Sequence, residues 1–405
     1  MVLALHSRGI GVIMDVVFNH TYRRDDSNLQ KIVPGYYYRS DETGYTNGSG
    51  CGNEVASDRP MVQKLIVDSL IYWAKEYHID GFRFDLMGVL DIDTMNVIAE
   101  RLKEIRPDIY LYGEGWNGGP SSLAEEKRAF KASAKKVPGI GMFNDDIRDT
   151  IKGSVFYDDH LGFVNGGTHL ENALRYGITG AVAHPQVDYD AYGSKPWAKE
   201  PGQSINYVSC HDNYTLWDKL SVSCPEASEE KKKAMNRLCA AIVFTSQGVP
   251  FIQAGEEFLR SKPLPEKKGF AENSYNMPDE VNSIKWDNIH EYPDMIAYYK
   301  GLMELRKAHP VFRMQSEAEM TQNLCFLSDT PENVVAYLLK GKGADDTPEN
   351  ILVIFNGNDK EILYNLPEGK WKILVDGKTA GADGKKIISE KADVEPLSAL
   401  VLEKE

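Results

Sequence analysis

The sequence predicts a parallel β/α barrel that is followed by a β-sandwich domain. Two observations predict the barrel. Apolar runs typical of buried strands alternate with amphipathic helices, and polar or charged residues follow each run at its C-terminal end. A closed barrel gathers such residues from many strand ends on one face, whereas an open doubly wound sheet collects them at one switch point. We therefore predict a (β/α)8 TIM barrel, incomplete at the N-terminus, for residues 1–312, and a C-terminal all-β sandwich domain for residues 313–405.

The composition excludes several classes of partner. The chain has 405 residues, of which 42% are hydrophobic, so it is long enough to bury a large core in more than one domain. A formal charge of -14 argues against a nucleic acid or an anionic membrane as partner and is compatible with neutral, polyhydroxylated ligands. The five cysteines show no zinc-ligand spacing and are expected to be free thiols. No apolar run is long enough to cross a bilayer.

The first elements follow from local patterns. Residues 1–8 are expected to be the end of an amphipathic helix, which Gly9 caps. Residues 11–20 form a continuous apolar run closed by Asn19 and His20, as expected of a parallel strand buried on both faces. No glycine-rich phosphate loop follows this strand, so a nucleotide cofactor has no support. The segment 25–59 is rich in Gly, Tyr, Ser and Asn and is typical of a functional loop.

The strand at residues 79–87 carries the strongest functional signal, and a helix predicted at residues 61–77 precedes it. Arg83 and Asp85 are two residues apart, so on a strand they share one face while Phe82 and Phe84 pack on the other. The guanidinium would keep the carboxylate ionised, which suits nucleophilic attack on a sugar carbon. On this stretch alone, a structural ion pair at a strand end is the alternative.

The alternation continues to residue 309. We predict helices at 93–105 and 296–309, strands at 109–116 and 139–143, and loop with short helix at 157–201. Two further strands end in His211-Asp212-Asn213 and in Glu256-Glu257. From there on, short alternating runs separated by turn residues predict the β-sandwich strands, at 325–327, 334–339, 351–355, 371–375 and 399–402.

Four motifs occur in order along the chain: Asp-Val-Val-Phe-Asn-His at 15–20, Gly-Phe-Arg-Phe-Asp at 81–85, Tyr-Gly-Glu-Gly-Trp at 112–116 and Val-Ser-Cys-His-Asp-Asn at 208–213. Together they resemble the signature regions of the α-amylase superfamily, glycoside hydrolase family 13. Within that family, Phe-Asp-Leu-Met-Gly at 84–88, His-Asp-Asn-Tyr-Thr-Leu-Trp-Asp at 211–218 and Asn-Ser-Tyr-Asn-Met-Pro-Asp at 273–279 are similar to type I pullulanases. The resemblance covers the whole chain.

The resemblance implies a retaining glycoside hydrolase that cleaves α-1,6 linkages in pullulan, amylopectin and glycogen limit dextrins, with no metal or other cofactor. It makes Asp85 the nucleophile, Glu114 the general acid and base, and Asp212 the stabiliser of the transition state. Retention requires two carboxyl groups about 5–5.5 Å apart, so Glu114 must begin the reaction protonated. The resemblance also implies that Asp15 orients Arg83. The implied substrate contacts are His20, Arg83, Trp116, His211, Asn273 and Asp279.

The sequence also departs from the family pattern. The first signature falls on the third strand of the family barrel, so two strands and a tyrosine-bearing motif are expected to lie upstream of Met1. A secretion signal would also lie upstream, and the cytoplasm is the favoured compartment only because none is seen. Two alternatives remain, an α-1,4-acting amylase or neopullulanase and a non-catalytic glucan-binding homologue. Binding homologues usually lose one of the three carboxylates, and all three are present here, which favours the enzyme.

Overall fold

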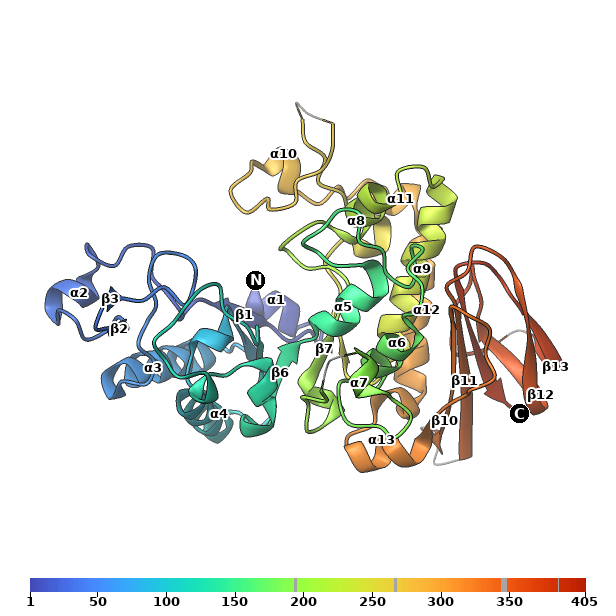
Figure 1. The fold of residues 1–405 in the computed structure, drawn as a ribbon, viewed down its shortest axis with the longest axis horizontal. Coiled ribbons are helices and arrows are strands. Elements are labelled where there is room, and N and C mark those ends of the chain that lie inside the picture. The colour runs from blue at the N-terminus through green and yellow to red at the C-terminus, as the bar shows by residue number, and fades with distance from the viewer. Residues whose placement is uncertain (193–194, 266–267, 344–347, 385) are drawn as a thin grey trace. The chain divides into compact units, whose positions relative to one another are not determined.

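The computed structural model describes residues 1–192, 195–265, 268–343, 348–384 and 386–405 (Figure 1). The chain divides into two units. The first contains Met1–Phe143 and Trp197–Ser204, and the second contains Asn144–Pro196 and Ile205–Glu405. Parallel strands separated by helices form a partial barrel, and an antiparallel β domain follows it at the C-terminus, which confirms the predicted fold class. The domain boundary predicted after residue 312 stays a prediction.

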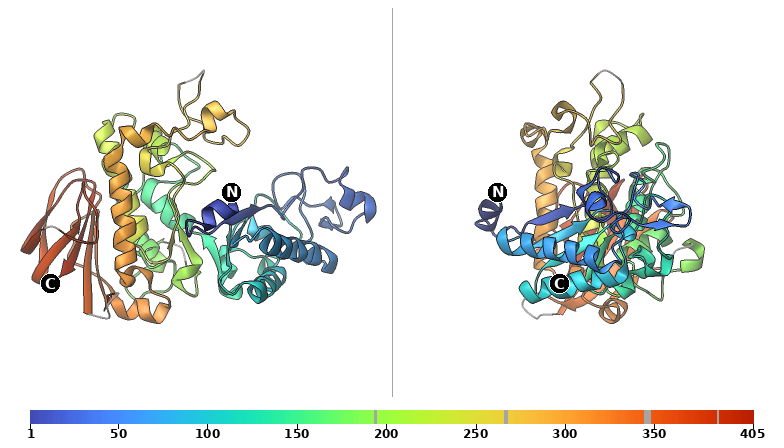
Figure 2. Two further views of the ribbon diagram at one scale, coloured as in Figure 1. Left: turned by 180° about the vertical axis from the view of Figure 1, so that it is seen from behind. Right: turned by 90° about the vertical axis from the view of Figure 1, so that its left-hand side faces the viewer.

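The first unit is built on four parallel strands, in the order β1 (Ile13–Val16), β4 (Gly81–Phe84), β5 (Tyr110–Gly113) and β6 (Ile140–Phe143). Helices α3 (Pro60–Glu76) and α4 (Ile92–Ile105) connect them and lie side by side (Figures 1 and 2). The long loop after β1 contains α2 (Asn28–Ile32) and the hairpin β2 (Ser40–Asp41) and β3 (Gly44–Tyr45). The helix predicted before the first strand is α1 (Val2–His6).

Strand β1 corrects one prediction, because it is not buried on both faces. Ile13 is 39% exposed and Val17, directly after the strand, is 52% exposed, whereas Val16 is buried. Among the described residues β1 pairs with β4 and with no second strand. A strand at the edge of a sheet lacks a neighbour on one flank, so a continuous apolar run does not by itself ensure burial.

Side-chain caps fix where several helices begin. Asp91 accepts a hydrogen bond from the backbone N–H of Thr94 at the start of α4. Asn144 caps α5 (Asp145–Lys152), Thr215 caps α8 (Leu216–Ser223) and Ser228 caps α9 (Glu229–Thr245) in the same way. Such a cap satisfies one backbone N–H that the helix itself leaves unpaired. None of the helices in the described part of the chain has the length and apolarity needed to cross a bilayer.

In the second unit, residues 205 and 206 of β7 (Ser204–Asn206) pair in parallel with β8 (Val249–Pro250). Helices α9 and α12 (Pro293–Ala308) run side by side, and the C-terminal sheet packs against α9 (Figures 1 and 2). Tyr299 of α12 donates a hydrogen bond to Asn236 of α9 at 2.9 Å. The shorter elements of the chain are α6 (Glu171–Ile178), α7 (Tyr189–Tyr192), α10 (Asp279–Asn282), α11 (Asn288–Glu291), α13 (Glu317–Asn323), η1 (Met87–Val89), η2 (Glu125–Lys127), η3 (Lys131–Lys136), η4 (Pro201–Gln203), η5 (Glu256–Phe258) and η6 (Pro310–Arg313).

The C-terminal domain is a six-stranded antiparallel sheet in the order β13-β12-β14-β11-β10-β9. Five strands match predicted runs, and a sixth, β13, has no predicted counterpart. The strands are β9 (Leu324–Phe326), β10 (Val334–Lys342), β11 (Pro348–Asn356), β12 (Ile362–Val375), β13 (Ile387–Val394) and β14 (Ser398–Lys404). β12 is longer than predicted because it pairs with two neighbours, β13 and β14.

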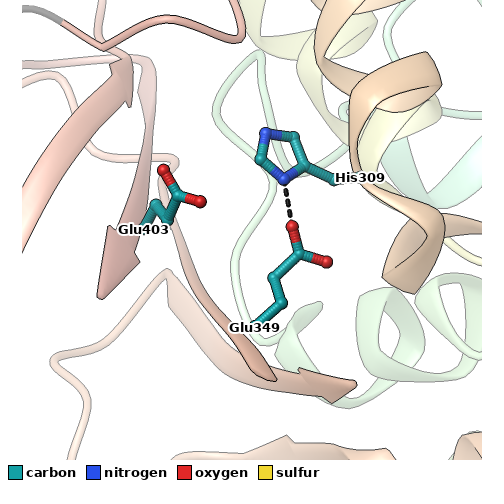
Figure 3. Close-up of side chains that lie close together, drawn as sticks. All are labelled: His309, Glu349 and Glu403. Atoms are coloured by element: carbon teal, nitrogen blue, oxygen red, sulfur yellow. Dashed lines mark hydrogen bonds and ion pairs between the residues drawn. The ribbon is translucent and has the colours of Figure 1, made fainter. Parts of the chain in front are cut away.

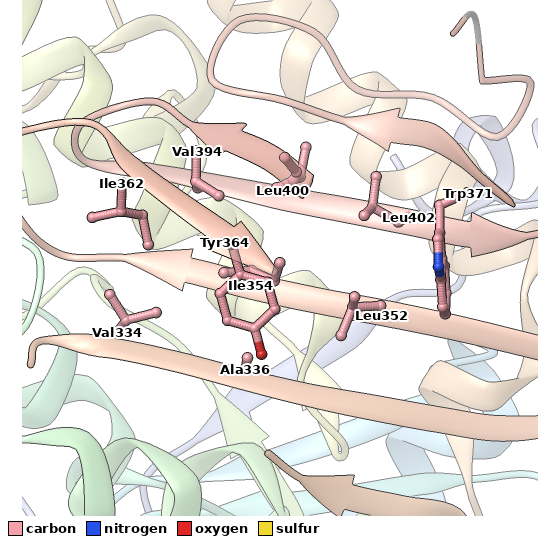
Figure 4. Packing of buried hydrophobic residues seen from close by; sticks show 11 residues of the cluster. Val334, Ala336, Leu352, Ile354, Ile362, Tyr364, Trp371, Val394, Leu400 and Leu402 are labelled. Atoms are coloured by element: carbon pink, nitrogen blue, oxygen red, sulfur yellow. The ribbon is translucent and has the colours of Figure 1, made fainter. Parts of the chain in front are cut away.

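Alternate residues of this sheet build its core. Val334 of β10, Leu352 of β11 and Trp371 of β12 belong to one buried cluster (Figure 4). The intervening residues are buried as well, since η6 and α6 contact β10. Tyr337, on that second face, donates a hydrogen bond to the backbone carbonyl of Thr245 in α9 at 3.0 Å. Burial on both faces explains why β10 has a nearly continuous apolar sequence.

Candidate active site

Arg83 on β4 is the centre of a carboxylate cluster in the first unit. Its Nη1 donates to Asp15 Oδ1 at 2.8 Å and to Asp85 Oδ1 at 2.9 Å. Its Nη2 donates to Glu114 Oε1 at 2.6 Å. Burial lowers the pKa of the guanidinium, but the charges of Glu114, Asp15 and Asp85 outweigh burial and raise the pKa overall. Arg83 therefore stays a cation that three carboxylates share.

The parallel register brings these residues together. Arg83 lies opposite Asp15 of β1 and Tyr112 of β5, so the residues that follow all three strands leave the sheet at one edge. Arg83 and Asp85 interact directly, as their spacing predicts, whereas Phe82 and Phe84 are fully buried. The predicted contact between Asp15 and Arg83 is also confirmed.

Both oxygens of the Asp85 carboxylate are held. Oδ1 accepts from Arg83, and Oδ2 accepts from Asn19 Nδ2 at 2.9 Å. The same Asn19 amide donates to the backbone carbonyl of Asp85 at 2.8 Å, and His20 Nδ1 lies 2.5 Å from Asn19 Oδ1. Asn19 is buried and His20 is half-buried. The polar residues that close β1 thus fix the orientation of the carboxylate that follows β4.

Glu114, directly after β5, is 6% exposed. Its Oε1 contacts Arg83, and its Oε2 accepts from the backbone N–H of Leu86 at 2.7 Å. Leu86 has a φ of 39° and a ψ of 51°, in the left-handed region that a leucine rarely adopts. Such a conformation costs about 1–3 kcal/mol and persists only where the surroundings enforce it. Here it points a backbone donor at Glu114.

Asp85 and Glu114 are the two carboxyl groups predicted to carry out a double displacement. Asp85 and Glu114 contact the two terminal nitrogens of one guanidinium. Retaining glycosidases use two carboxyl groups about 5–5.5 Å apart, with one attacking and the other protonating the leaving oxygen. Asp85 and Glu114 lie near one another through their shared guanidinium, and their catalytic roles stay predictions.

The other predicted site residues of the second unit lie in two segments that Lys262 connects. Lys262 Nζ donates to the backbone carbonyl of His211 at 3.3 Å and to Ser274 Oγ, beside Asn273, at 2.8 Å. Burial, and then the charge of Arg260, lowers the pKa of the Lys262 ammonium. The segments that carry His211 and Asn273 are therefore joined through one buried cation.

The side chains on these segments are open to solvent. His211 Nε2 lies 3.6 Å from Asp212 Oδ2, and the two side chains are 62% and 47% exposed. Asn273 is exposed, and so is Asp279, the first residue of α10. The roles of these four residues stay predictions.

The chain is similar to known proteins over most of its length. The family model for the all-β domain of pullulanase matches residues 321–379. The pullulanase of Bacillus subtilis (strain 168) is 41% identical over 378 residues, which cover 93% of this chain and 51% of that protein. The chain is a homologue of the pullulanases. It spans about half the length of the curated relatives it matches.

Solved structures agree with this pullulanase homologue over its full length. A pullulanase from Bacillus acidopullulyticus has a TM-score of 0.91 at 42% identity and covers 100% of this chain, which spans 47% of that one. The pullulanase from Paenibacillus barengoltzii in complex with maltohexaose and alpha-cyclodextrin has a TM-score of 0.89 at 42% identity, with 100% and 60% of the two chains covered. The resemblance stated from the four motifs is confirmed.

Trp116, in this pullulanase homologue, follows Glu114 on a segment that passes close to the end of β4. It is half-buried. A Cβ added to Gly88 would lie 2.5 Å from the backbone carbonyl of Trp116, so only glycine allows the two segments to approach so closely. The indole is partly open, as a platform for a sugar ring requires, but its role stays a prediction.

Three supporting groups of the pullulanase homologue were not assigned a role from sequence: Asn19, Leu86 and Lys262. The sequence does indicate that Asn19 lies near the site, because Asn19 ends the apolar run of β1 beside His20. The backbone N–H of Leu86 is placed by a left-handed backbone conformation, which a leucine in the sequence does not predict. Lys262 contacts His211 and Ser274, which are 51 and 12 positions away in the sequence, so no local pattern indicates its role.

Proposed function

We propose that this chain carries the catalytic residues of a retaining hydrolase that cleaves α-1,6-glucosidic linkages in branched α-glucans. The observation that carries the proposal is that Arg83 contacts Asp85 and Glu114 at once. The 41% identity to a pullulanase supports the linkage type. A relative named as a complex with maltohexaose and alpha-cyclodextrin supports α-glucans as the substrate class. Pullulan, amylopectin and glycogen limit dextrins are the proposed substrates.

In the first step of the proposed reaction, an Asp85 oxygen attacks the anomeric carbon while Glu114 gives a proton to the leaving oxygen. A covalent glycosyl ester forms and the glucosidic bond breaks. In the second step, Glu114 takes a proton from water, which attacks the same carbon and releases Asp85. Arg83 and Asn19 hold the Asp85 carboxylate in a single orientation before attack, which lowers the entropic cost of reaching the transition state.

To act as the general acid, Glu114 must be protonated before the glucosidic bond breaks. Both of its oxygens accept N–H hydrogen bonds, from Arg83 Nη2 and from the Leu86 backbone, which is how an ionised carboxylate is bound. A proton must therefore reach Glu114 before the leaving oxygen departs. Substrate that excludes water from the buried cluster would favour this step, since a low dielectric disfavours the charged form of the carboxyl group.

We assign Asp212 the third catalytic role and the remaining predicted residues a role in substrate binding. Asp212 would stabilise the positive charge that develops on the sugar ring, and Trp116 would stack on the glucan beyond the cleavage point. His20, His211 and Arg83 would grip the sugar at that point, and Asn273 and Asp279 would bond its hydroxyl groups. The four ordered motifs that contain most of these residues support the assignment.

Replacing Asp85 by Asn tests the proposal. The amide keeps the shape of the carboxylate but cannot attack, so pullulan hydrolysis should fall by at least about a thousandfold while malto-oligosaccharide binding changes little. Asp93→Asn, at an exposed carboxylate on α4, is the matched control. Comparable rates for wild type and Asp85→Asn would refute the nucleophile assignment.

The products of the wild-type reaction separate the alternatives. Maltotriose released from pullulan means α-1,6 cleavage, whereas panose means α-1,4 cleavage and an amylase or neopullulanase. Glucan binding without turnover would identify a binding homologue and contradict the proposal.

A further inference from the structure

A second cluster of ligand-type side chains lies far along the chain from the catalytic motifs. We propose that His309, Glu349 and Glu403 bind a divalent transition-metal ion, with Zn²⁺ as the best match. Each residue offers one ligand atom, and these atoms all lie within 4.8 Å of one another (Figure 3). All three residues belong to the second unit.

The fold brings the three residues together from separate elements. His309 caps the C-terminal end of α12, Glu349 lies on β11 and Glu403 lies on β14. Glu403 is paired in register with Ile351, two residues after Glu349. Residues two apart on a strand share a face, so both carboxylates stand on the face of the sheet that meets the end of α12 (Figure 3).

Unsatisfied polar atoms point to a ligand at this place. His309 Nδ1 is hydrogen-bonded to Glu349 Oε1, but within the described residues His309 Nε2 and Glu349 Oε2 have no hydrogen-bond partner. His309 is 6% exposed and Glu349 is 7% exposed, so water does not freely replace the missing partners. Buried polar groups are normally paired, and a bound cation would supply the interaction that the His309 imidazole lacks, whereas Glu349 Oε2 points away from the other two residues (Figure 3).

The charge balance favours a cation. Within the described residues, Lys372 Nζ lies 2.5 Å from Glu403 Oε2, at a rim where these side chains are 31% and 25% exposed. With a neutral imidazole, the cluster keeps one excess negative charge. A divalent ion would neutralise that charge and displace the Lys372 ammonium from Glu403. The known chemistry of the proposed hydrolysis leaves all three residues unused.

The donor set selects the ion. One imidazole nitrogen and two carboxylate oxygens suit Zn²⁺, which accepts four ligands and would keep one position for water. Ca²⁺ and Mg²⁺ prefer sets made only of oxygen atoms. An ion held by a helix end and two strands would tie the C-terminal sheet to α12, so its role is structural.

Metal titration of the full chain tests the proposal. After chelator treatment and dialysis, we expect one equivalent of Zn²⁺ to bind by calorimetry and to raise the thermal unfolding midpoint. Co²⁺ should give the absorption bands of a site with nitrogen and oxygen ligands. Glu349→Gln and Glu403→Gln should each weaken Zn²⁺ binding at least about tenfold. Lys372→Met should strengthen it, because the competing ammonium is gone.

The controls make a negative result decisive. Glu361→Gln, at an exposed carboxylate of the same domain, should leave Zn²⁺ binding unchanged. If Glu349→Gln fails to fold, Glu403→Gln and Lys372→Met still decide, since both alter the partly exposed rim. No saturable binding by about 1 mM Zn²⁺ would identify a buried histidine–glutamate pair only and overturn the proposal. If Zn²⁺ binds but none of these variants changes its affinity, the ion binds elsewhere and the proposal is overturned.

Discussion

Replacing Glu256 by Gln should remove a pH-dependent loss of stability from the second unit. Glu256, in η5 after β8, is 3% exposed. Its Oε2 accepts from Ser209 Oγ at 2.5 Å, and its Oε1 accepts from Tyr299 Oη at 3.3 Å. Burial raises the pKa of this carboxyl group from 4.5 to about 7, against the hydrogen bond from Ser209 and the charge of Lys152. The folded protein therefore binds this proton more tightly than the unfolded chain does.

The sign and size of the effect follow from the two pKa values. Because the pKa is raised on folding, the contribution of Glu256 to stability is fully present below about pH 4.5 and is lost as the pH rises through about 7. The gap of about 2.5 between the two values corresponds to about 3 kcal/mol. Gln does not ionise, so Glu256→Gln should become more stable relative to wild type by about 3 kcal/mol across this range.

A neighbouring lysine sets the upper limit of the useful pH range. Burial lowers the pKa of Lys152 from 10.5 to about 8. For a base with a lowered pKa the sign is opposite: its contribution is present above about pH 10.5 and lost as the pH falls through about 8. Measurements between about pH 5 and 7 therefore keep Lys152 largely charged in the wild type. Because the charge of Glu256 raises the pKa of Lys152, Glu256→Gln lowers that pKa further, so the difference between the two proteins reports Glu256 together with its coupling to Lys152.

Urea denaturation of wild type and Glu256→Gln at several pH values measures the effect. Glu280→Gln, at an exposed carboxylate on α10, is the control and should follow the wild-type curve. The free-energy difference between Glu256→Gln and wild type should grow steadily with pH. Two parallel curves would refute the reasoning, because they would mean that Glu256 has the same proton affinity in the folded and unfolded states.

Three further substitutions test the site and the packing. Asn19→Ala removes a donor from Asp85, so kcat on pullulan should fall about 10- to 100-fold with little change in glucan binding; an unchanged kcat would contradict its positioning role. Trp116→Ala should lower kcat/KM on pullulan, by an amount equivalent to about 1–3 kcal/mol of transition-state stabilisation, and should lower kcat/KM on an activated aryl maltoside less. Equal losses on the two substrates would mean that the indole packs in the protein core. Gly301→Ala should destabilise the chain by about 1–3 kcal/mol in thermal unfolding, because its Cβ would collide with the backbone carbonyl of Ala380. Gly381→Ala, with open space around the added Cβ, should have almost no effect.

The core of the candidate site could be predicted from sequence because its geometry is local. Arg83 and Asp85 share a face through strand periodicity alone, and the structure places their side chains in contact. Glu114 and Asp15 join them because parallel strands present their C-terminal ends at one edge. Each of these inferences needs only the strand assignment and the chain order.

Other features depend on neighbours that the sequence does not name. The apolar run of β1 predicts burial on both faces, yet Ile13 and Val17 are exposed because the strand pairs on one flank only. The backbone donor of Leu86 arises from a left-handed conformation imposed by its surroundings, although leucine has no intrinsic preference for it. His309, Glu349 and Glu403 come from one helix end and two strands, so no spacing rule groups them.

Glu256 shows why a polar residue at a strand end is not yet a site residue. The sequence places Glu256-Glu257 after an apolar run in the same way as His211-Asp212-Asn213. The structure separates the two cases by exposure: Asp212 and His211 are open to solvent, whereas Glu256 is buried between Ser209 and Tyr299. A buried carboxyl group with a raised pKa lowers stability at neutral pH without reaching a substrate. The rule that finds strand-end polar residues therefore identifies candidates, and the contacts of each side chain separate them. Glu114, at 6% exposed, shares the Arg83 guanidinium with Asp85, whereas Glu256, at 3% exposed, is hydrogen-bonded to Ser209 and Tyr299.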